Sequence, residues 1–365
     1  MDKKQPLKSF LKDIASLIGS GAMLRFSFPG EGRKHTSVSC ITQTSQFYSR
    51  FPYDVEGNLD EIEPFILPLE GLLSASTTET IKSPAKLEAK ENSFVVQTAR
   101  ARLELATETA TESLSKPPSI PEPLCEIPMS SSFKDMLKEV LPLLGMEKIH
   151  EAQADFRLFC KMSKKSVFLA CYSSQQVAFC SMSNEFGVSG SFNVPHPAFV
   201  SFLKVVPSDS ALSFGEDRML AKSGSFSLLQ LVAPLSGKEP PGDVVYERSL
   251  AISSSHESAG YIAVTKAAME EFVASCKGVV TDDSAVHFSV EGTNLNLKID
   301  TSASAVEFRI RKVESTLSEP FALELRLLKN IVSKVGDQLK LHYDNGVLLV
   351  QSGAFGLITT THAAA

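Results

Sequence analysis

One short apolar stretch of this sequence occurs three times, at intervals of about 130 residues. Its copies are EPFILPL at 63–69, GSFNVPH at 190–196 and EPFALEL at 319–325. Each copy leads into an amphipathic stretch and then into a pattern of paired strands. Because solenoid repeats run to only about 20 to 50 residues, a period of this length is that of a whole domain. The sequence therefore predicts three copies of one fold in a row, and 365 residues suffice for three cores of ordinary size.

Changes in composition indicate where the three domains meet. Proline recurs between residues 113 and 128, in a stretch that can be neither the interior of a helix nor a central strand. A second change follows Pro240-Pro241-Gly242, where a serine-rich segment at 253–258 precedes a new apolar stretch. We therefore expect domains at 1–114, 128–247 and 248–365, with a proline-rich linker at 115–127.

The hydrophobic pattern within each domain predicts an α+β fold. Apolar residues at helical spacing indicate two helices per domain, and short alternating runs between them indicate strands. The six helices are predicted at Leu7–Leu17, Leu69–Leu73, Phe133–Leu144, Phe199–Val206, Met269–Cys276 and Leu325–Val335. Near the end of the chain, Asn345-Gly346 separates two alternating runs and supplies the positive φ angles of a tight hairpin turn. We expect each domain to pack its two helices on two antiparallel sheets.

The composition excludes several classes of protein. A net charge of −6 and a pI near 5.7 exclude a chain that holds nucleic acid by overall attraction, which needs a broadly basic surface. No window approaches the roughly 18 apolar residues of a membrane span, and the first residues do not resemble a signal peptide. We therefore expect a cytoplasmic protein without a membrane partner.

The cysteines and histidines show no pattern of a metal site. The six cysteines are scattered through apolar strands without a C-x-x-C pair, and the seven histidines lie far apart. Such cysteines are typical of small buried hydrophobes. We expect no metal and no other cofactor.

Basic residues recur on the predicted helices. Lys8 and Lys12 are four residues apart, as are Lys134 and Lys138 at the equivalent place in the second domain, so each pair lies on one helical face. Lysines turned to one side of a curved array can face a phosphate backbone without reading base sequence. The residues that we expect to face DNA are Lys8, Lys12, Lys134, Lys138, Lys204, Lys266, Arg326 and Lys329. For any single pair, an ordinary solvated helix face is the alternative.

Two motifs, taken with the three tandem domains, resemble a known family. Thr98–Thr107 is similar to the strand S-G-R-S-R-F-x-L-x-T, keeping Arg100, Arg102 and the final Leu-x-Thr. Cys171–Met182 is similar to A-T-D-G-H-R-L-A-x-C-S-M, whose end it keeps and whose Asp-Gly-His-Arg centre it lacks. Both motifs belong to the bacterial DNA polymerase III beta subunit, the sliding clamp. The chain resembles a divergent member of that family, such as one encoded by a phage or another mobile element.

The resemblance implies a fold of three tandem DNA-clamp domains and a ring. Two subunits joined head to tail would enclose duplex DNA with six domains, and the helices would line the hole. It further implies a non-enzymatic processivity factor in DNA replication, bound by a DNA polymerase and by a clamp loader.

The resemblance also implies two sets of contact residues. A pocket between the second and third domains would receive short peptides of partner proteins. Its lining would be Tyr172, Gln175, Gln176, Val177, Pro241, Val245, Leu357 and Ile358. At the ring joint, Arg100 and Arg102 would meet Asp300 or Glu307 of the other subunit.

Two other classes of function stay open at this point. The pattern S-x-x-K, found in penicillin-binding enzymes, occurs at Ser9, Ser131 and Ser201, but the S-D-N and K-T-G elements that accompany it are missing. Serines that precede amphipathic runs are also ordinary helix caps. We therefore expect no enzyme. A structural or assembly protein built of tandem α+β domains is the remaining alternative.

Overall fold

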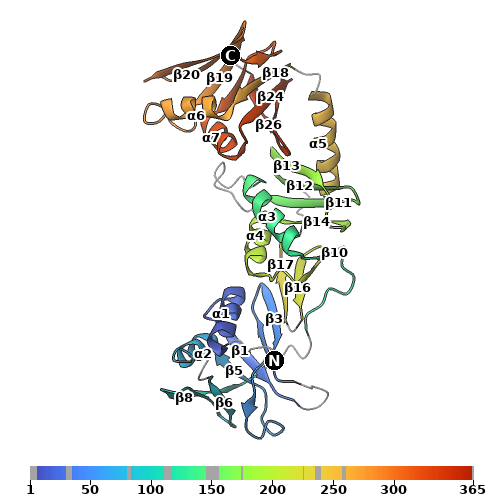
Figure 1. The fold of residues 1–365 in the computed structure, drawn as a ribbon, viewed down its shortest axis with the longest axis vertical. Coiled ribbons are helices and arrows are strands. Elements are labelled where there is room, and N and C mark those ends of the chain that lie inside the picture. The colour runs from blue at the N-terminus through green and yellow to red at the C-terminus, as the bar shows by residue number, and fades with distance from the viewer. Residues whose placement is uncertain are drawn as a thin grey trace. The chain divides into compact units, whose positions relative to one another are not determined.

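The computed structural model describes residues 6–29, 35–79, 84–110, 117–144, 156–173, 176–224, 226–234, 240–256 and 260–363. The chain divides into two compact units, one of residues 1–131 with 201–232 and the other of residues 132–200 with 233–365. Among the described residues there are seven helices and four sheets, which confirms the α+β prediction (Figure 1). None of these helices is both long and apolar enough to cross a membrane.

The first unit contains a nine-stranded and a four-stranded sheet. The larger has the order β10 (Cys125–Pro128), β15 (Ala211–Phe214), β16 (Arg218–Ser223), β17 (Phe226–Leu231), β3 (Ser45–Arg50), β2 (Ser37–Ile41), β1 (Met23–Ser27), β5 (Phe65–Pro68), β9 (Glu108–Thr109). The smaller has the order β4 (Val55–Glu56), β6 (Lys86–Ala89), β7 (Ser93–Gln97), β8 (Arg102–Ala106). Helices α1 (Leu7–Ile18) and α2 (Leu69–Ala75) lie side by side against these strands (Figure 1).

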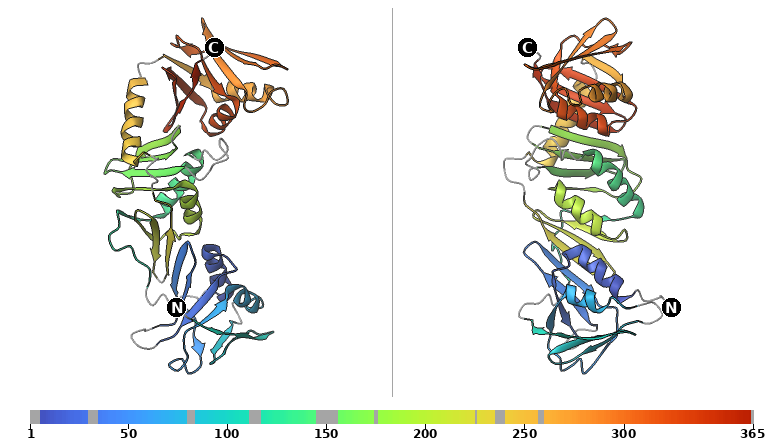
Figure 2. Two further views of the ribbon diagram at one scale, coloured as in Figure 1. Left: turned by 180° about the vertical axis from the view of Figure 1, so that it is seen from behind. Right: turned by 90° about the vertical axis from the view of Figure 1, so that its left-hand side faces the viewer.

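The second unit contains a nine-stranded and a five-stranded sheet. The larger has the order β14 (Gly190–Pro195), β11 (Arg157–Met162), β12 (Ser166–Tyr172), β13 (Gln176–Ser183), β26 (Phe355–Thr360), β25 (Val347–Ser352), β24 (Gln338–Asp344), β18 (Gly260–Thr265), β22 (Glu314–Ser315). The smaller has the order β21 (Ala305–Arg311), β20 (Asn294–Asp300), β19 (Ala285–Glu291), β23 (Phe321–Glu324), β27 (His362–Ala363). Helix α6 (Lys266–Ser275) lies beside α7 (Leu325–Lys334), as Figure 2 shows.

The repeated stretch forms the same local structure three times. In each copy a strand leads without a loop into a helix: β5 into α2, β14 into α4 (His196–Val205), and β23 into α7. The first N–H of each helix also makes an equivalent hydrogen bond, to the carbonyl just before the strand that pairs with β5, β14 or β23, namely β1, β11 or β19. These bonds are Leu69 to Ala22, His196 to Phe156 and Leu325 to Ser284, each 2.9 Å. The backbone therefore repeats more closely than the side chains do.

The remaining helices agree with the predicted apolar spacing, with one addition. α3 (Ser131–Leu144) buries Phe133 and Leu137, and α6 buries Met269 and Phe272, as their periodicity predicts. The hairpin is also confirmed, because β24 and β25 are joined by Asn345-Gly346 with φ angles of 47° and 79°. The addition is α5 (Gly242–His256), a seventh helix where a domain boundary is expected after residue 247.

Sheet pairing also joins residues that we assign to different domains. Within the first unit β17 pairs with β3, and within the second unit β13 pairs with β26. Each nine-stranded sheet therefore continues from one expected domain into the next. The core follows the sheets and the helices that cover them, with Phe26, Phe199 and Phe288 fully buried.

Candidate nucleic-acid interface and partner site

The predicted DNA-facing residues of α1 differ in how firmly they are held. Lys12 is exposed on the outer side of the helix. Lys8 is half-buried, and its ammonium donates to the carbonyl of Thr77 at 3.4 Å while its backbone N–H donates to Glu79 at 3.0 Å. Both lysines thus lie on α1 as predicted, but Lys8 is tied to the segment that follows α2.

The prediction that Lys134 lies on an exposed polar face is wrong. Only 8% of this residue is exposed, and it belongs to the buried side of α3 together with Leu137 and Leu141. Burial, helped by the positive charge of Lys138, holds the pKa of the Lys134 ammonium below its usual value. Lys138 itself is exposed and pairs with Asp135 at 3.0 Å. Residue 134 precedes residues 137 and 141 by three and seven, and this helical spacing already places it on the apolar stripe.

The predicted DNA-facing residues of α6 and α7 have carboxylate partners. Lys266 lies 3.9 Å from Glu270 and donates to the carbonyl of Val335 at 3.2 Å. Lys329 pairs with Asp282 at 2.6 Å, and Arg326 pairs with Asp283. Lys204, in the last turn of α4, is exposed. Lys266, Arg326 and Lys329 therefore lie on the predicted helices, but a nearby carboxylate compensates the charge of each.

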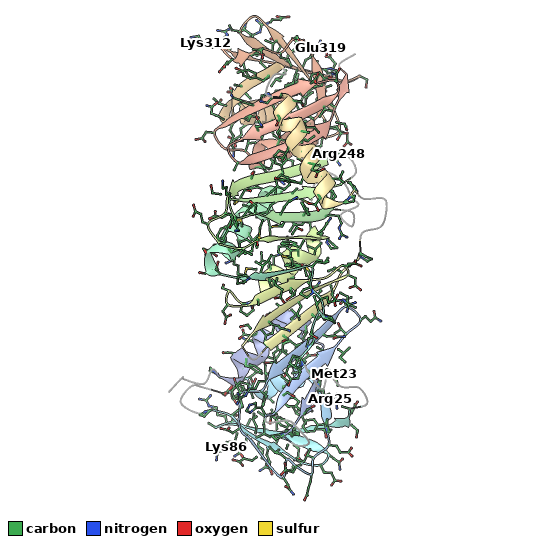
Figure 3. All side chains as sticks on the ribbon, turned by 90° about the vertical axis from the view of Figure 1, so that its right-hand side faces the viewer. Met23, Arg25, Lys86, Arg248, Lys312 and Glu319 are labelled. Carbon is green, nitrogen blue, oxygen red and sulfur yellow. The ribbon has the colours of Figure 1, made fainter. Side chains whose placement is uncertain are left out.

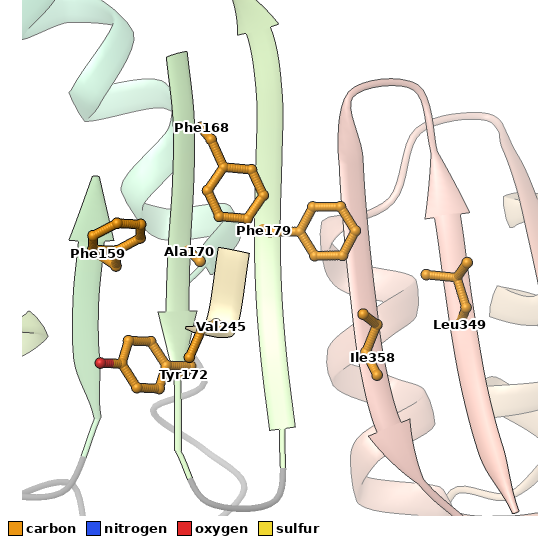
Figure 4. Packing of buried hydrophobic residues seen from close by; sticks show 8 residues of the cluster. All are labelled: Phe159, Phe168, Ala170, Tyr172, Phe179, Val245, Leu349 and Ile358. Carbon is orange, nitrogen blue, oxygen red and sulfur yellow. The ribbon is translucent and has the colours of Figure 1, made fainter. Parts of the chain in front are cut away.

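Four of the eight predicted pocket residues meet in one hydrophobic core. Tyr172, Val245 and Ile358 are buried together with aromatic rings of β11, β12 and β13, and Val177 packs against them (Figure 4). Helix α5 supplies Val245, and the strands of the nine-stranded sheet supply the others. The arrangement is a packed junction between α5 and the sheet, in which the ring of Tyr172 is fully buried.

The other predicted pocket residues that the structure describes do not belong to this core. Leu357 is buried but adjoins Ile358 in β26, so its side chain lies on the opposite face of the strand. Pro241 is exposed just before α5. The amide oxygen Oε1 of Gln176 is buried with no hydrogen-bond partner among the described residues. Gln175 lies outside the described residues.

A buried polar network supports this junction and was not predicted. The hydroxyl of Tyr172 donates to the carbonyl of Pro240 at 3.0 Å and accepts from Nδ2 of Asn193 at 2.7 Å. The guanidinium of Arg157, only 3% exposed, donates to Oδ1 of Asn193 at 3.2 Å and to the carbonyl of Ala233 at 2.9 Å. Asn193 belongs to the second copy of the repeat, which is the only sequence signal that singles it out.

Helix α5 is further held by Lys161 of β11. Lys161 pairs with Asp243 at 2.8 Å, and its ammonium lies 4.5 Å from the centre of the Tyr246 ring. The hydrogen bond to Asp243 raises the pKa of Lys161. Lys161 therefore fastens the start of α5 to β11, whereas Arg248, labelled in Figure 3, is an exposed residue of the same helix.

The predicted joint residues of the first unit lie at an open edge of a sheet. β8 is the last strand of the four-stranded sheet, and its side chains are largely exposed, including Leu103 at 42%. Arg102 begins this strand and lies 3.6 Å from Glu88. The motif predicts Arg100 on the same strand, but Arg100 lies in the preceding turn, where the Thr98 N–H donates to the carbonyl of Ala101 at 2.7 Å.

The predicted joint residues of the second unit also lie at a sheet edge. β21 is the last strand of the five-stranded sheet and carries Glu307, while Asp300 ends β20. Both carboxylates face Lys298, at 2.8 Å for Asp300 and 3.5 Å for Glu307, and they raise the pKa of this lysine. A polar hollow of ≈ 480 Å³ lies on β19, β20 and β21, lined in part by Lys298, Glu307 and Arg309.

The chain has the fold of DNA sliding clamps. A structure of the Pseudomonas aeruginosa DNA polymerase sliding clamp with ligand superposes with a TM-score of 0.71 at 12% identity, covering 99% of both chains. The DNA polymerase III subunit beta of the same organism gives a TM-score of 0.69 at 13% identity, covering 98% of both chains. The Helicobacter pylori beta clamp bound to a DNA ligase peptide gives 0.65 at 12% identity, again over 98% of both chains.

These likenesses establish the fold of the bacterial DNA polymerase III beta subunit over nearly the full length of the chain. No protein-family model matches the sequence, and no curated protein matches it either. The resemblance drawn from the two degenerate motifs is therefore confirmed at the level of the fold.

Proposed function

We propose that this protein is a divergent sliding clamp, a non-catalytic processivity factor that encloses duplex DNA and tethers replication proteins to it. The observation that carries the proposal is a clamp fold over 98% or more of the chain. A protein of net charge −6 gains little from general attraction to DNA. Enclosure accounts for DNA retention without a strongly basic surface.

The open strand edges support a ring made of two subunits. Among the residues that the structure describes, β8 and β21 each end a sheet, and an unpaired edge is a template for pairing with another chain. Arg100 and Arg102 lie beside one edge, and Asp300 and Glu307 beside the other. We propose that these edges pair head to tail in a homodimer of three domains per subunit, at 1–114, 128–247 and 248–365.

The helices supply the proposed DNA contacts. Lys12, Lys138 and Lys204 are exposed on α1, α3 and α4, and such side chains contact phosphates without reading base sequence. Lys8, Lys266, Arg326 and Lys329 contribute where their present partners release them. Lys134 is left out of this set because it is buried.

The junction around Tyr172 and Val245 is the proposed site for partner peptides. The Helicobacter pylori clamp was solved with a DNA ligase peptide, and we propose that a DNA polymerase and a clamp loader of this system present similar segments. Apolar walls with a few amides, one of them here from Gln176, suit an extended peptide with hydrophobic anchors. Since the core is packed, we expect peptide binding to require movement of α5.

Trapping on end-blocked DNA tests the proposal without a cognate loader. The protein is incubated with a linear duplex biotinylated at both ends, and streptavidin is added either afterwards or beforehand. An enclosing ring threads over free ends, so only the first order of addition should leave protein on the DNA after a high-salt wash. Equal retention in both orders would show ordinary surface binding, and no retention in either would favour a structural protein.

A further inference from the structure

Two aspartates pair with two cations of α7, Lys329 and Arg326. Lys329 Nζ lies 2.6 Å from Asp282 Oδ1, and Arg326 pairs with Asp283. The cationic side chains are 32% and 36% exposed, and the carboxylates are 53% and 74% exposed. Both ion pairs are therefore within reach of solvent and of a ligand. A phosphate that approaches α7 meets cations that already have partners.

The backbone fixes the aspartates beside the helix. Arg326 N–H donates to the carbonyl of Asp282 at 2.8 Å, and Leu325 N–H donates to the carbonyl of Ser284 at 2.9 Å. The loop is closed by a third bond, from Ser284 N–H to Thr281 at 3.1 Å. The carboxylates are thus held at α7 rather than on a freely moving segment.

The internal repeat shows that this arrangement belongs to the third domain. Counted from the strand-to-helix junction, the positions of Arg326 and Lys329 correspond to Glu70 and Leu73 in α2 and to Pro197 and Val200 in α4. Counted back from the starts of β1, β11 and β19, Asp282 corresponds to Ser20 and Ala154, and Asp283 to Gly21 and Asp155. The two cations and Asp282 therefore occur together in one repeat and are replaced together in the others.

We propose that Asp282 and Asp283, the aspartate pair, compete with DNA phosphates for Arg326 and Lys329 and so weaken the hold of the third domain on DNA. The inference rests on the proposed function. An exposed ion pair is weak enough for a phosphate to displace it. Each cation must nevertheless lose a carboxylate before it gains a phosphate, which reduces the net attraction. A ring that encloses DNA needs no firm grip, and weak contacts let it slide.

The aspartate pair also has a purely structural interpretation, which makes a different prediction. Negative charge near a helix N-terminus is favourable because of the helix dipole, and Asp282 and Asp283 lie at the start of α7. If that were their whole effect, removing the charges would lower thermal stability and leave DNA affinity unchanged. DNA affinity and its salt dependence therefore separate the two interpretations.

The test compares full-length variants that lose two neighbouring carboxylates in different places. Asp282→Asn/Asp283→Asn removes the aspartate pair. Glu216→Gln/Asp217→Asn is the matched control, because these residues also form a turn with an arginine ion pair, Asp217 to Arg218 at 2.6 Å, but on a strand turn instead of a helix. Each variant is first shown to be folded by circular dichroism and thermal melting.

Binding to a short fluorescent duplex is then measured by anisotropy at several salt concentrations. We expect Asp282→Asn/Asp283→Asn to bind several-fold tighter than wild type at low salt. The slope of log K against log salt should steepen by up to about 0.9 for each cation released. The control should match wild type, and adding Arg326→Ala/Lys329→Ala to the first variant should remove the gain.

Two results would overturn the inference. One is a folded Asp282→Asn/Asp283→Asn variant whose affinity and salt slope equal those of wild type. The other is an equal gain in the control, which would mean that only net charge matters. If wild type is trapped on end-blocked DNA while either result holds, the inference alone fails. If wild type is not trapped at all, the proposed function fails and the inference fails with it.

Discussion

At the scale of single residues, close packing where β13 pairs with β26 leaves no room for a side chain at Gly356 of β26. Its partner in the ladder is Phe179, and a Cβ added to Gly356 would lie 2.3 Å from the end of that ring. The ring therefore occupies the space above the glycine. The pairing that continues the sheet across the second unit depends on this fit.

We predict that Gly356→Ala lowers the free energy of unfolding by about 1–3 kcal/mol, the usual cost of overpacking a core. Denaturant unfolding followed by circular dichroism measures it. Gly21→Ala is the control, since a Cβ there has nothing within 4 Å and the change should stay within about 0.5 kcal/mol. Equal stability of the two variants would contradict the packing described here.

The hydroxyl of Tyr172 allows a second prediction at this scale. Tyr172→Phe leaves Nδ2 of Asn193 and the carbonyl of Pro240 without this partner in a buried place. Because a buried polar group that loses its hydrogen bond costs about 1–3 kcal/mol, we expect a loss of that size in unfolding free energy. Tyr48→Phe is the control: Tyr48 in β3 is only half-buried, so the unfolding free energy should change little. A neutral Tyr172→Phe would show that the network does not fasten the junction.

At the scale of elements, all six cysteines are buried, as the sequence predicts. Cys180 in β13 is 2% exposed, and burial raises the pKa of its thiol to about 11. Because the thiol ionises at a lower pH in the unfolded chain than in the folded protein, rising pH favours the unfolded chain. The stability that the neutral thiol contributes is complete below the unfolded pKa and is lost as the pH rises to the folded pKa. The relevant window runs from about pH 9 to about pH 11.

We therefore predict that unfolding free energy falls more steeply with pH in wild type than in Cys180→Ala across this window, by up to about 1.4 kcal/mol per pH unit. Urea titrations at pH 8, 9, 10 and 11 give the two slopes. A thiol reagent at pH 8 should also label native protein slowly. Parallel slopes together with rapid labelling of Cys180 would show that this residue is not buried in solution.

The elements also show which features the sequence could predict. The helices with an apolar stripe, such as α6 with Met269 and Phe272, follow directly from their spacing. Helix α5 does not, because its inner side mixes Val245 with the buried Ser249, and serines give no hydrophobic period. The spacing of Lys134 from Leu137 indicates that it is buried, but the charge of the lysine suggested a polar face.

Contacts between distant residues lie beyond a reading of local patterns. The partners of Lys329 and Arg326 are more than 40 residues away, so only the folded chain brings them together. The same holds for Lys161 and Asp243. The sequence thus predicts where the basic residues lie, whereas the structure determines how much of their charge is already satisfied.

At the scale of the whole molecule, the open edges of β8 and β21 lead to a prediction about assembly. We expect a dimer of about twice 39.6 kDa by sedimentation velocity. Arg100→Glu/Arg102→Glu should dissociate it, because the new acidic groups would face Asp300 and Glu307. Like charges across an interface are costly.

Reversal of two charges elsewhere provides the control for this prediction. Lys164→Glu/Lys165→Glu changes the exposed turn between β11 and β12 and should leave the dimer intact. A monomeric wild type would contradict the two-subunit ring. So would a dimer that survives reversal of both arginines unchanged, since its contact would then lie elsewhere.

Enclosure of DNA is the central claim, and cutting a circle tests it most directly. The protein is threaded onto a linear duplex, the duplex is closed with DNA ligase, and the complex is isolated by gel filtration in high salt. A restriction enzyme then opens the circle. We predict that the protein stays on the intact circle and leaves once the circle is cut. Equal retention before and after cutting would show that the protein grips the surface of DNA, and this would contradict a ring that encloses it.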